Sequence, residues 1–415
     1  MRVYLGRSKI YGALRAPRSK SHAIRLIFSS LLSPIEITDL PYSEDVISSI
    51  RAVKALGVKI SGSRFEVDGE PRIIDDRIYV GGSATTLRIL IPIITVIGGR
   101  AYIDGDNTLK RRPLDALVEA VRDRGVFVSS SRVPVTIKGK LDEDWVRIRG
   151  SESSQYISGY MIAFCLKGFG EIYVEPPLVS KSYIYLTRDV LRDFGCYVTI
   201  DPSKISVTRV EKPRIVRKRV EGDYALSSFY AASALATGGS IEIYDLPEPR
   251  DYFGDHSILE IYRSMGAYSQ YFEGSWRAEA GVEYRAIEVN IDNAPDLGPS
   301  IAPIAALSNG ITRIRGVERL RIKESDRIET IINVLKRFGI RSGYRESVLE
   351  IEGQPGTALN SATIDCESDH RIAMMASVLA LRAEGVIESA ECVNKSNPNF
   401  WGDLVSVGGA LRVES

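Results

Sequence analysis

Long apolar runs and an excess of one charge are both absent from this 415-residue sequence. Its longest apolar run, residues 89–98 (ILIPIITVIG), is about half as long as a membrane-spanning helix. Its 54 Lys and Arg residues nearly balance 53 Asp and Glu, so no broad basic face for nucleic acid is expected. The amino terminus begins with a strand-like MRVYLG instead of a basic and then apolar signal. These absences predict a cytoplasmic protein with no membrane and no nucleic-acid partner.

Cysteine and histidine are also scarce. The four cysteines are scattered, form no CxxC motif and are accompanied by only three histidines. This argues against a disulfide framework and against a zinc site, so no metal is expected. The composition is 44% hydrophobic and 26% charged, which is ordinary for a globular protein, and the length allows two or three domains.

Six segments share one pattern, a helix that ends at a glycine and is followed by an apolar, strand-like stretch. Glycine takes the left-handed conformation after a helix at no steric cost. The spacings between successive glycines are 68, 70, 71, 73 and 70 residues. Such a period is too long for a solenoid repeat and fits a small α/β unit. The six glycines are Gly57, Gly125, Gly195, Gly266, Gly339 and, in the weakest copy, Gly409.

Each repeat also contains an earlier helix with a polar beginning. Ser, Asn or Asp at a helix start can accept hydrogen bonds from the free amides of the first turn. The small and apolar residues that follow predict helices buried on most sides. These helices are expected to start near Ser19, Ser83, Ser153, Glu221, Asn293 and Ser368.

Three repeats before about residue 220 and three after it predict two similar domains. We expect an N-terminal domain over residues 15–221 and a second domain over residues 1–14 plus 222–415. The charged, proline-bearing stretch 207–223 is the expected crossing between them. The strand before Leu14 has no repeat of its own, and we assign it to the second domain.

Basic side chains cluster near these helix starts. A helix N-terminus offers free N–H groups and partial positive charge, so phosphate and carboxylate are its natural ligands. Arg can grip such anions with two hydrogen bonds, and Lys supplies a point charge. The pattern therefore predicts a site for one or more small polyanions. The basic residues concerned are Lys20, Arg25, Arg88, Arg112, Lys323, Arg327, Arg371 and Lys395.

The segment LRIKESDRIE, residues 320–329, is the densest charge cluster of this kind. Its alternation predicts that a strand ends near Lys323, and helical spacing from Ser325 onward predicts Ser325 as an N-cap. Two interpretations stay open at this point, a solvated set of paired charges or part of a site. His370 and Asp296 are equally open, because each can cap a helix or take part in proton transfer.

The motifs, in order and over nearly the whole chain, resemble those of the 5-enolpyruvylshikimate-3-phosphate synthase family. KESDR and DHRxAM match almost letter for letter, and the series as a whole is highly specific. The matching stretches are PRSKSHAIR, GGSATTLR, DGDNTLKRRP, SSQYISGYM, SKSYI, EGDYALSS, APDLGPS, LRIKESDRI, DHRIAM and KSNPNF.

The resemblance implies an α/β (α+β) fold of two similar domains, each built from three βαβαββ repeats, with the active site in the interdomain cleft. This fold is also described as an inside-out α/β barrel. The implied reaction transfers the enolpyruvyl group of phosphoenolpyruvate to the 5-hydroxyl of shikimate 3-phosphate and releases phosphate. It belongs to the shikimate pathway to chorismate and aromatic amino acids. No cofactor is implied, and we expect a monomer.

The resemblance also assigns roles to residues. Asp296, Lys323, Glu324 and Lys20 are the implied catalytic residues. Shikimate 3-phosphate is expected to contact Lys20, Ser21, Arg25, Ser153, Ser154, Gln155, Ser180, Tyr183, Asp296 and Lys323. Phosphoenolpyruvate is expected to contact Lys20, Ala84, Arg88, Arg112, Gln155, Arg327, Arg371 and Lys395.

Four positions depart from the family pattern. Arg18 stands where glycine is usual, and Ser182 stands where proline is usual. Gly82 replaces an asparagine, and Ala84 replaces a glycine. The extra methyl group of Ala84 is expected to leave room for phosphoenolpyruvate and to crowd the longer inhibitor glyphosate.

Two rival functions are weighed against this one. A UDP-N-acetylglucosamine enolpyruvyl transferase shares the fold and the donor, but its loop carries a reactive cysteine, and DGDNTLKRRP has none. A non-catalytic anion-binding relative is the other rival. The intact set Lys20, Asp296, Lys323, Glu324 and Arg327 argues against it.

Overall fold

The computed structural model describes residues 1–250 and 252–414, and these divide into two compact units. The N-terminal unit is Arg18–Val220, and the C-terminal unit is Met1–Pro17 with Glu221–Ser415. Each unit has its own hydrophobic core. In the part of the chain that is described, no helix is long and apolar enough to cross a membrane.

The N-terminal unit contains three four-stranded sheets of identical design. In each sheet the first pair of strands is parallel and the other two pairs are antiparallel. In spatial order, the strands of the first sheet are β14 (Val216–Arg219), β3 (Ile35–Thr38), β5 (Arg64–Val67) and β4 (Val58–Ser61). Those of the second sheet are β6 (Arg77–Tyr79), β7 (Gly99–Asp104), β9 (Val135–Gly139) and β8 (Val126–Val128). Those of the third sheet are β10 (Trp145–Arg149), β11 (Phe169–Glu175), β13 (Lys204–Arg209) and β12 (Cys196–Ile200).

The C-terminal unit repeats this design three more times. The strands of its first sheet are β2 (Tyr11–Arg15), β15 (Ser240–Tyr244), β17 (Ser275–Glu279) and β16 (Tyr268–Phe272). Those of its second sheet are β19 (Glu288–Asn290), β21 (Ile311–Arg315), β23 (Val348–Glu352) and β22 (Arg341–Arg345). Those of its third sheet are β24 (Ala362–Asp365), β25 (Gly385–Glu388), β1 (Arg2–Leu5) and β26 (Leu411–Glu414). The same unit also contains a short two-stranded sheet, formed by β18 (Tyr284–Arg285) and β20 (Ser308–Asn309). The predicted repeat fold is therefore present in both units.

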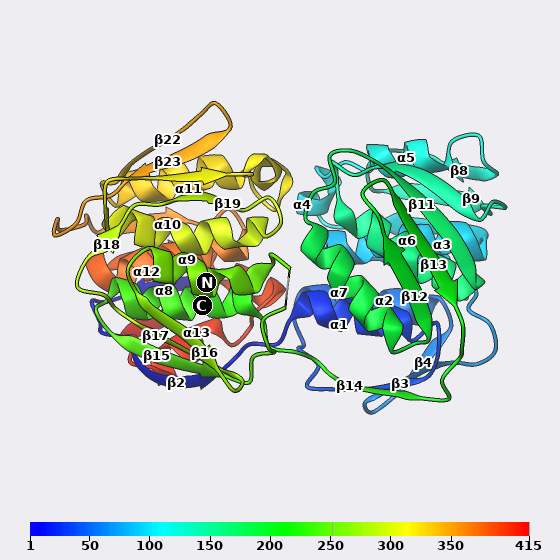
Figure 1. Cartoon of the computed structure of the whole chain (residues 1–415), viewed down its shortest axis with the longest axis horizontal. Helices are drawn as coiled ribbons and strands as arrows, with labels where there is room; N and C mark the ends of the chain where they lie inside the picture. Colours follow the sequence, from blue (N-terminus) through cyan, green and yellow to red (C-terminus); the bar gives the residue numbers. More distant parts are fainter. Residues whose placement is uncertain (251, 415) are drawn as a thin grey trace. The chain divides into compact units, whose positions relative to one another are not determined.

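Helices fill the middle of each unit, and strands lie around them (Figure 1). In the N-terminal unit they are α1 (Lys20–Ser29), α2 (Glu44–Ala55), α3 (Ala84–Ile97), α4 (Asn107–Lys110), α5 (Asp115–Val121), α6 (Ser154–Lys167) and α7 (Lys181–Arg192). In the C-terminal unit they are α8 (Tyr224–Ala236), α9 (Ile258–Ser264), α10 (Gly298–Leu307), α11 (Arg327–Arg337), α12 (His370–Ala383) and α13 (Phe400–Ser406). Four 3₁₀ turns accompany them, η1 (Asp255–Ser257), η2 (Pro295–Leu297), η3 (Glu318–Ile322) and η4 (Ala390–Lys395).

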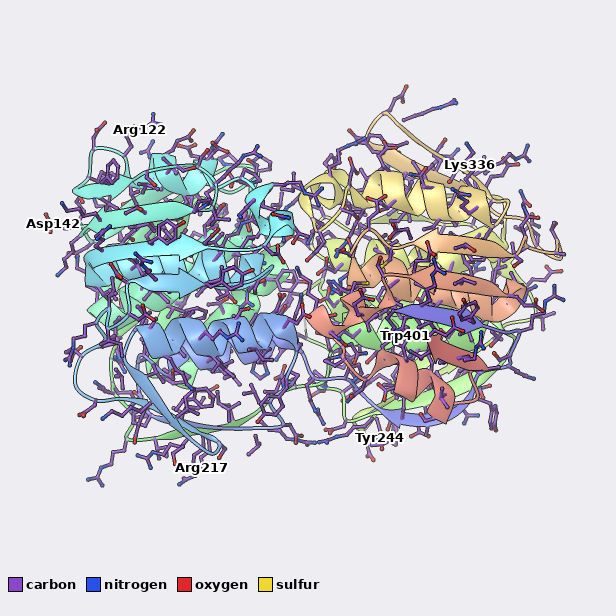
Figure 2. All side chains as sticks on the ribbon, turned by 180° about the vertical axis from the view of Figure 1, so that it is seen from behind. Arg122, Asp142, Arg217, Tyr244, Lys336 and Trp401 are labelled. Carbon is purple, nitrogen blue, oxygen red and sulfur yellow. A yellow bond between two sulfur atoms is a disulfide. The ribbon has the colours of Figure 1, made fainter. Side chains whose placement is uncertain are left out.

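The first helix of each repeat is buried almost all round, as its small and apolar residues predict. Every residue of α3 except its last is buried, and α8 and α10 are buried along their whole length. The helices α3 and α6 cross closely at Gly159, where an added Cβ would lie 2.9 Å from the carbonyl oxygen of Arg88. The polar ends of both helices are thereby held together. Charged side chains such as Arg122, Asp142 and Arg217 are exposed on the outside (Figure 2).

Five of the six predicted helix-ending glycines have the expected positive φ, between 74° and 102°. In the weak sixth copy the positive φ falls on Gly408, with φ 99°, and Gly409 does not have it. The prediction was therefore one residue off there, because two consecutive glycines leave the position of the turn ambiguous.

The strands that pass between the units are exchanged. β2 precedes α1 of the N-terminal unit but pairs with β15 of the C-terminal unit. β14 precedes α8 of the C-terminal unit but pairs with β3 of the N-terminal unit. β1 lies between β25 and β26, so the start of the chain completes the last sheet.

The scattered cysteines argued against a disulfide framework, and the structure nevertheless contains a disulfide. Cys165 on α6 and Cys196 on β12 are joined, with their Cα atoms 6.1 Å apart. They are 31 residues apart in sequence and meet because α6 packs on the sheet that contains β12. A pairing of this kind depends on tertiary packing, which cysteine spacing does not reveal.

The interior position of β1 predicts a stability contribution from its side chains. Val3 is fully buried opposite Ile387 and Val413, and we expect Val3→Ala to lower the free energy of unfolding by about 2 kcal/mol. The control is Arg2→Ala, whose side chain is 60% exposed, with an expected loss below about 1 kcal/mol. Urea unfolding followed by the fluorescence of Trp276 and Trp401 measures both. Equal losses in the two variants would contradict an interior β1.

Candidate active site

In the N-terminal unit, Lys20 is the first residue of α1 and forms a buried ion pair. Its Nζ donates to Asp45 Oδ2 on α2 at 2.7 Å. The side chains of Lys20 and Asp45 are 13% and 5% exposed. Ser19 caps the helix by accepting from the amide of His22 at 3.4 Å. The pair fixes the ammonium group at a helix N-terminus.

Arg25, one turn further along α1, is held by neutral acceptors. Its Nε donates to Thr187 Oγ1 at 2.7 Å, and its Nη2 donates to Ser158 Oγ at 3.3 Å. The carbonyl oxygens of Ser21 and Tyr183 accept from the guanidinium at 2.8 and 3.2 Å. The structure thus brings three predicted shikimate 3-phosphate residues together, Ser21, Arg25 and Tyr183.

Arg88 of α3 is a buried cation, 1% exposed, beside Gln155 of α6. Its Nη1 donates to Gln155 Oε1 at 3.3 Å, and its Nη2 donates to the carbonyl oxygen of Pro113 at 3.3 Å. Its Nε has no hydrogen-bond partner, and within residues 1–250 and 252–414 no carboxylate pairs with it. Gln155 is oriented in turn by Thr85 Oγ1, which accepts from Nε2 at 2.8 Å. A desolvated guanidinium of this kind favours an anionic partner.

The other predicted residues of this unit lie at helix ends. Ser153 is the N-cap of α6, Ser154 is its first residue, and Ala84 is the first residue of α3. Ser180 precedes α7 with a left-handed φ of 51°. Arg112 follows α4, and its side chain is buried. The next residue, Pro113, accepts a hydrogen bond from Arg88 with its carbonyl oxygen.

In the C-terminal unit, Asp296 of η2 is surrounded by three cations. Its Oδ1 accepts from Lys323 Nζ at 3.1 Å and from Arg327 Nη1 at 2.9 Å. Its Oδ2 accepts from Arg371 Nη2 at 3.2 Å. Three residues of the LRIKESDRI motif, Lys323, Glu324 and Arg327, therefore share one network with Asp296, and Arg371 of the DHRIAM motif joins it.

Arg327 is the centre of that network and is fully buried. Asp369 accepts from its Nε at 2.8 Å and from its Nη2 at 3.0 Å. Glu324 accepts from the same Nη2 at 2.7 Å. Asp369 also caps α12 and accepts from Ser325 Oγ at 3.0 Å. Lys395, the last residue of η4, is buried in the same unit.

These charges shift one another's ionisation. Burial by itself would raise the pKa of Asp296, but Arg371, Lys323 and Arg327 hold that pKa well below its ordinary value. Burial lowers the pKa of Lys323 to about 8; Asp296 opposes this shift, and Arg327 and Arg319 add to it. The site therefore combines a permanently ionised carboxylate with an ammonium group that titrates near neutral pH.

The LRIKESDRIE segment differs from its prediction in two respects. Residues 318–322 form η3 instead of a strand, because Val317 and Leu320 point inward at a spacing of three residues. The N-cap of α11 is Asp326 instead of Ser325. Ser325 was a reasonable choice from sequence, but its hydroxyl is engaged by Asp369. Arg321 pairs with Asp326 at 2.7 Å and with Glu329 at 3.7 Å, so these three charges are paired locally.

The unusual Arg18 contacts residues of its own unit. Its guanidinium lies 3.3 Å from Asp39 Oδ2 and 3.4 Å from the carbonyl oxygen of Val220. Asp39 also pairs with Arg219 at 2.6 Å. The Arg18 side chain thus helps to hold residue 18 to residue 220, the two positions at which the chain enters and leaves the unit.

Sequence reasoning missed the partners that orient the predicted residues. Asp45 and Thr187 carry no signal of their own, whereas Thr85 lies in the quoted GGSATTLR stretch. Asp45 reads as an ordinary acidic residue in the first turn of a helix. Asp369 lies in the quoted DHRIAM stretch, which is the one clue that could have assigned it.

The six-repeat architecture is that of the two-domain enolpyruvyl transferases. A solved structure of EPSP synthase from Acinetobacter baumannii matches with a TM-score of 0.81, 24% identity and full coverage of both chains. At that identity the likeness shows the fold alone.

The family follows from sequence comparison. A family model described as EPSP synthase (3-phosphoshikimate 1-carboxyvinyltransferase) matches residues 5–404. The 3-phosphoshikimate 1-carboxyvinyltransferase of Saccharolobus solfataricus is 48% identical over 98% of both chains. Those of Sulfurisphaera tokodaii and Caldivirga maquilingensis are 47% and 41% identical, each over the full length of both chains. The chain belongs to the EPSP synthase family, which confirms the motif resemblance, and it is a transferase of the shikimate pathway.

The two buried arginines predict opposite effects on stability. Arg88→Met removes a charge that no carboxylate compensates, so we expect the free energy of unfolding to stay within about 1 kcal/mol or to rise. Arg327→Met leaves three carboxylates without their common partner, so we expect a loss of about 3 kcal/mol or more. Urea unfolding of the ligand-free protein measures both. If Arg88→Met proves as damaging as Arg327→Met, then Arg88 has a structural role and is not held ready for an anion.

Proposed function

We propose that this chain transfers the enolpyruvyl group of phosphoenolpyruvate to the 5-hydroxyl of shikimate 3-phosphate and releases phosphate. Family membership supports this reaction. The single observation that supports it most directly in the geometry is Arg88, a buried guanidinium with no carboxylate partner in the described chain. A bound carboxylate or phosphate would supply the missing charge.

Shikimate 3-phosphate binds, in this proposal, to the hydroxyl-rich helix starts. Arg25 and the serines around it offer hydrogen-bond donors of the right kind for a phosphate and a carboxylate. The residues assigned to it are Lys20, Ser21, Arg25, Ser153, Ser154, Gln155, Ser180, Tyr183, Asp296 and Lys323.

Phosphoenolpyruvate binds to the arginines of both units. Its carboxylate and phosphate need several cations, and each of the two units contributes some of them. The residues assigned to it are Lys20, Ala84, Arg88, Arg112, Gln155, Arg327, Arg371 and Lys395. This assignment requires that the helix starts of both units act on the same pair of substrates, in a cleft between the domains.

The chemistry is an addition followed by an elimination. The 5-hydroxyl oxygen adds to C2 of phosphoenolpyruvate as the methylene carbon gains a proton. The resulting tetrahedral adduct then loses a proton from its methyl group, and phosphate departs. Asp296 and Lys323 flank the 5-hydroxyl, which loses its proton as it adds, and Glu324 with Lys20 lies near the methylene carbon and the leaving phosphate. The arginines stabilise charge on the adduct.

We also propose that the protein works as a monomer in the cytoplasm. Each repeat sheet is completed within the chain, since the exchanged strands β2 and β14 and the initial strand β1 all pair internally.

The direct test of the reaction is phosphate release from phosphoenolpyruvate. We expect release with shikimate 3-phosphate as acceptor, and none above background with UDP-N-acetylglucosamine. Release with the nucleotide sugar alone would assign the chain to the rival reaction, and release with neither would support a non-catalytic relative.

Lys323 should control both rate and pH dependence. We expect Lys323→Met to lower kcat at least about 100-fold, because the cation that lies beside the attacking hydroxyl and stabilises charge on the adduct is lost. Lys323 is charged below its pKa of about 8 and loses that charge as pH rises, so kcat/KM should fall above that pH. In Lys323→Arg, whose charge persists, this decline should move to higher pH. Lys336→Met, an exposed lysine on α11, is the control. An unchanged kcat in Lys323→Met would refute the role.

Ala84 should govern sensitivity to glyphosate. Its side chain is buried, 4% exposed, at the first residue of α3. We expect Ala84→Gly to lower the inhibition constant of glyphosate by roughly 10-fold or more, because one methyl group is removed, and to change the KM for phosphoenolpyruvate by less than about 3-fold. Ala225→Gly, at the start of α8, is the matched control. Equal inhibition of the wild-type protein and Ala84→Gly would contradict the steric argument.

A further inference from the structure

The two cysteines outside the disulfide also lie together, in the C-terminal unit. Cys366 follows β24, and Cys392 lies in η4. Their Sγ atoms are 3.0 Å apart, about 1 Å beyond the length of a disulfide. The Cys366 thiol is buried and lies 3.3 Å from the carbonyl oxygens of Glu388 and Ser389. Cys392 is only half-buried, so a reagent can reach the pair from its side.

The two cysteines lie in two separate segments, and each segment leads to a residue of the candidate site. Asp369, which holds Arg327, lies three residues after Cys366, and Lys395 lies three residues after Cys392. The backbone on both sides is unusual. Glu367 and Ser368 have left-handed φ values of 51° and 60°, and Ser389 has 53°. Non-glycine residues adopt this conformation at a cost in free energy, so a cross-link here would oppose the opening of both turns.

We propose that Cys366 and Cys392 form a second disulfide, which locks the turn before α12 to η4. Each unit would then contain one disulfide, because Cys165 and Cys196 are joined in the N-terminal unit. The inference concerns covalent structure and does not depend on the proposed reaction.

The bond forms by thiol–disulfide exchange with a small-molecule disulfide. The Cys392 thiolate attacks that disulfide and releases one thiol, which leaves a mixed disulfide on Cys392. The Cys366 thiolate then attacks the Cys392 sulfur and releases the second thiol. The two cysteines together lose two protons and two electrons, and the reagent is reduced to two thiols.

The experiment is a count of free thiols combined with a peptide map. The full-length protein is incubated with oxidised glutathione, denatured without reductant, alkylated and digested. We expect no alkylated cysteine and a peptide that links Cys366 to Cys392. Two alkylated cysteines at these positions, or a stable glutathione adduct on Cys392 in the wild-type protein, would overturn the proposal. This map uses the wild-type chain and so does not depend on the folding of a variant.

Thermal unfolding tests the locking effect. Oxidation should raise the unfolding midpoint of the wild-type protein over its dithiothreitol-reduced form by about 5 °C more than it does in Cys392→Ser. Cys392→Ser can form only the disulfide between Cys165 and Cys196, so the rise in its unfolding midpoint measures the contribution of that bond alone. An equal rise in both proteins would overturn the locking effect.

Discussion

The ion pair between Arg327 and Asp369 is the constraint on which the charged cluster of the C-terminal unit depends. Both side chains are almost completely removed from water, so each charge must be satisfied within the protein. Two hydrogen bonds between them fix the guanidinium at the start of α11 against the start of α12. The remaining donors of Arg327 then hold Glu324 and Asp296. Asp296 in turn positions Lys323 and Arg371, so the geometry of the whole cluster follows from one buried pair.

The charged residues of the N-terminal unit are organised differently. Hydroxyl and carbonyl oxygens accept hydrogen bonds from Arg25 and Arg88, whereas Lys20 pairs with Asp45. Arg88 has no compensating carboxylate within the described residues, whereas Arg327 has three. Among the described residues, the charge of Arg327 is therefore compensated within the C-terminal unit, whereas the charge of Arg88 in the N-terminal unit is available for an anion.

Much of the fold could be read from the sequence, because its signals are local and repeated. Glycines about 70 residues apart and polar helix starts predicted six repeats, and six sheets of one design are present. The errors arose where tertiary contacts override local pattern. Ser325 has the chemistry of an N-cap but bonds to Asp369, and Asp326 takes the cap. Cys165 and Cys196 meet only because α6 packs on its sheet. The motif residues Lys323, Arg327 and Arg371 contact Asp296 in the structure, whereas orienting partners such as Asp45 could not be distinguished in sequence from ordinary surface carboxylates.

The central claim is that helix starts from both units hold the same phosphoenolpyruvate molecule. Calorimetric titration of phosphoenolpyruvate in the presence of shikimate 3-phosphate tests it, with the catalytically slow Lys323→Met protein as the parent. The parent should bind one phosphoenolpyruvate per chain. The account predicts that Arg88→Met in one unit and Arg371→Met in the other each abolish this binding. If either variant retains a full equivalent of tightly bound phosphoenolpyruvate, the two groups of residues serve different ligands and the account is contradicted.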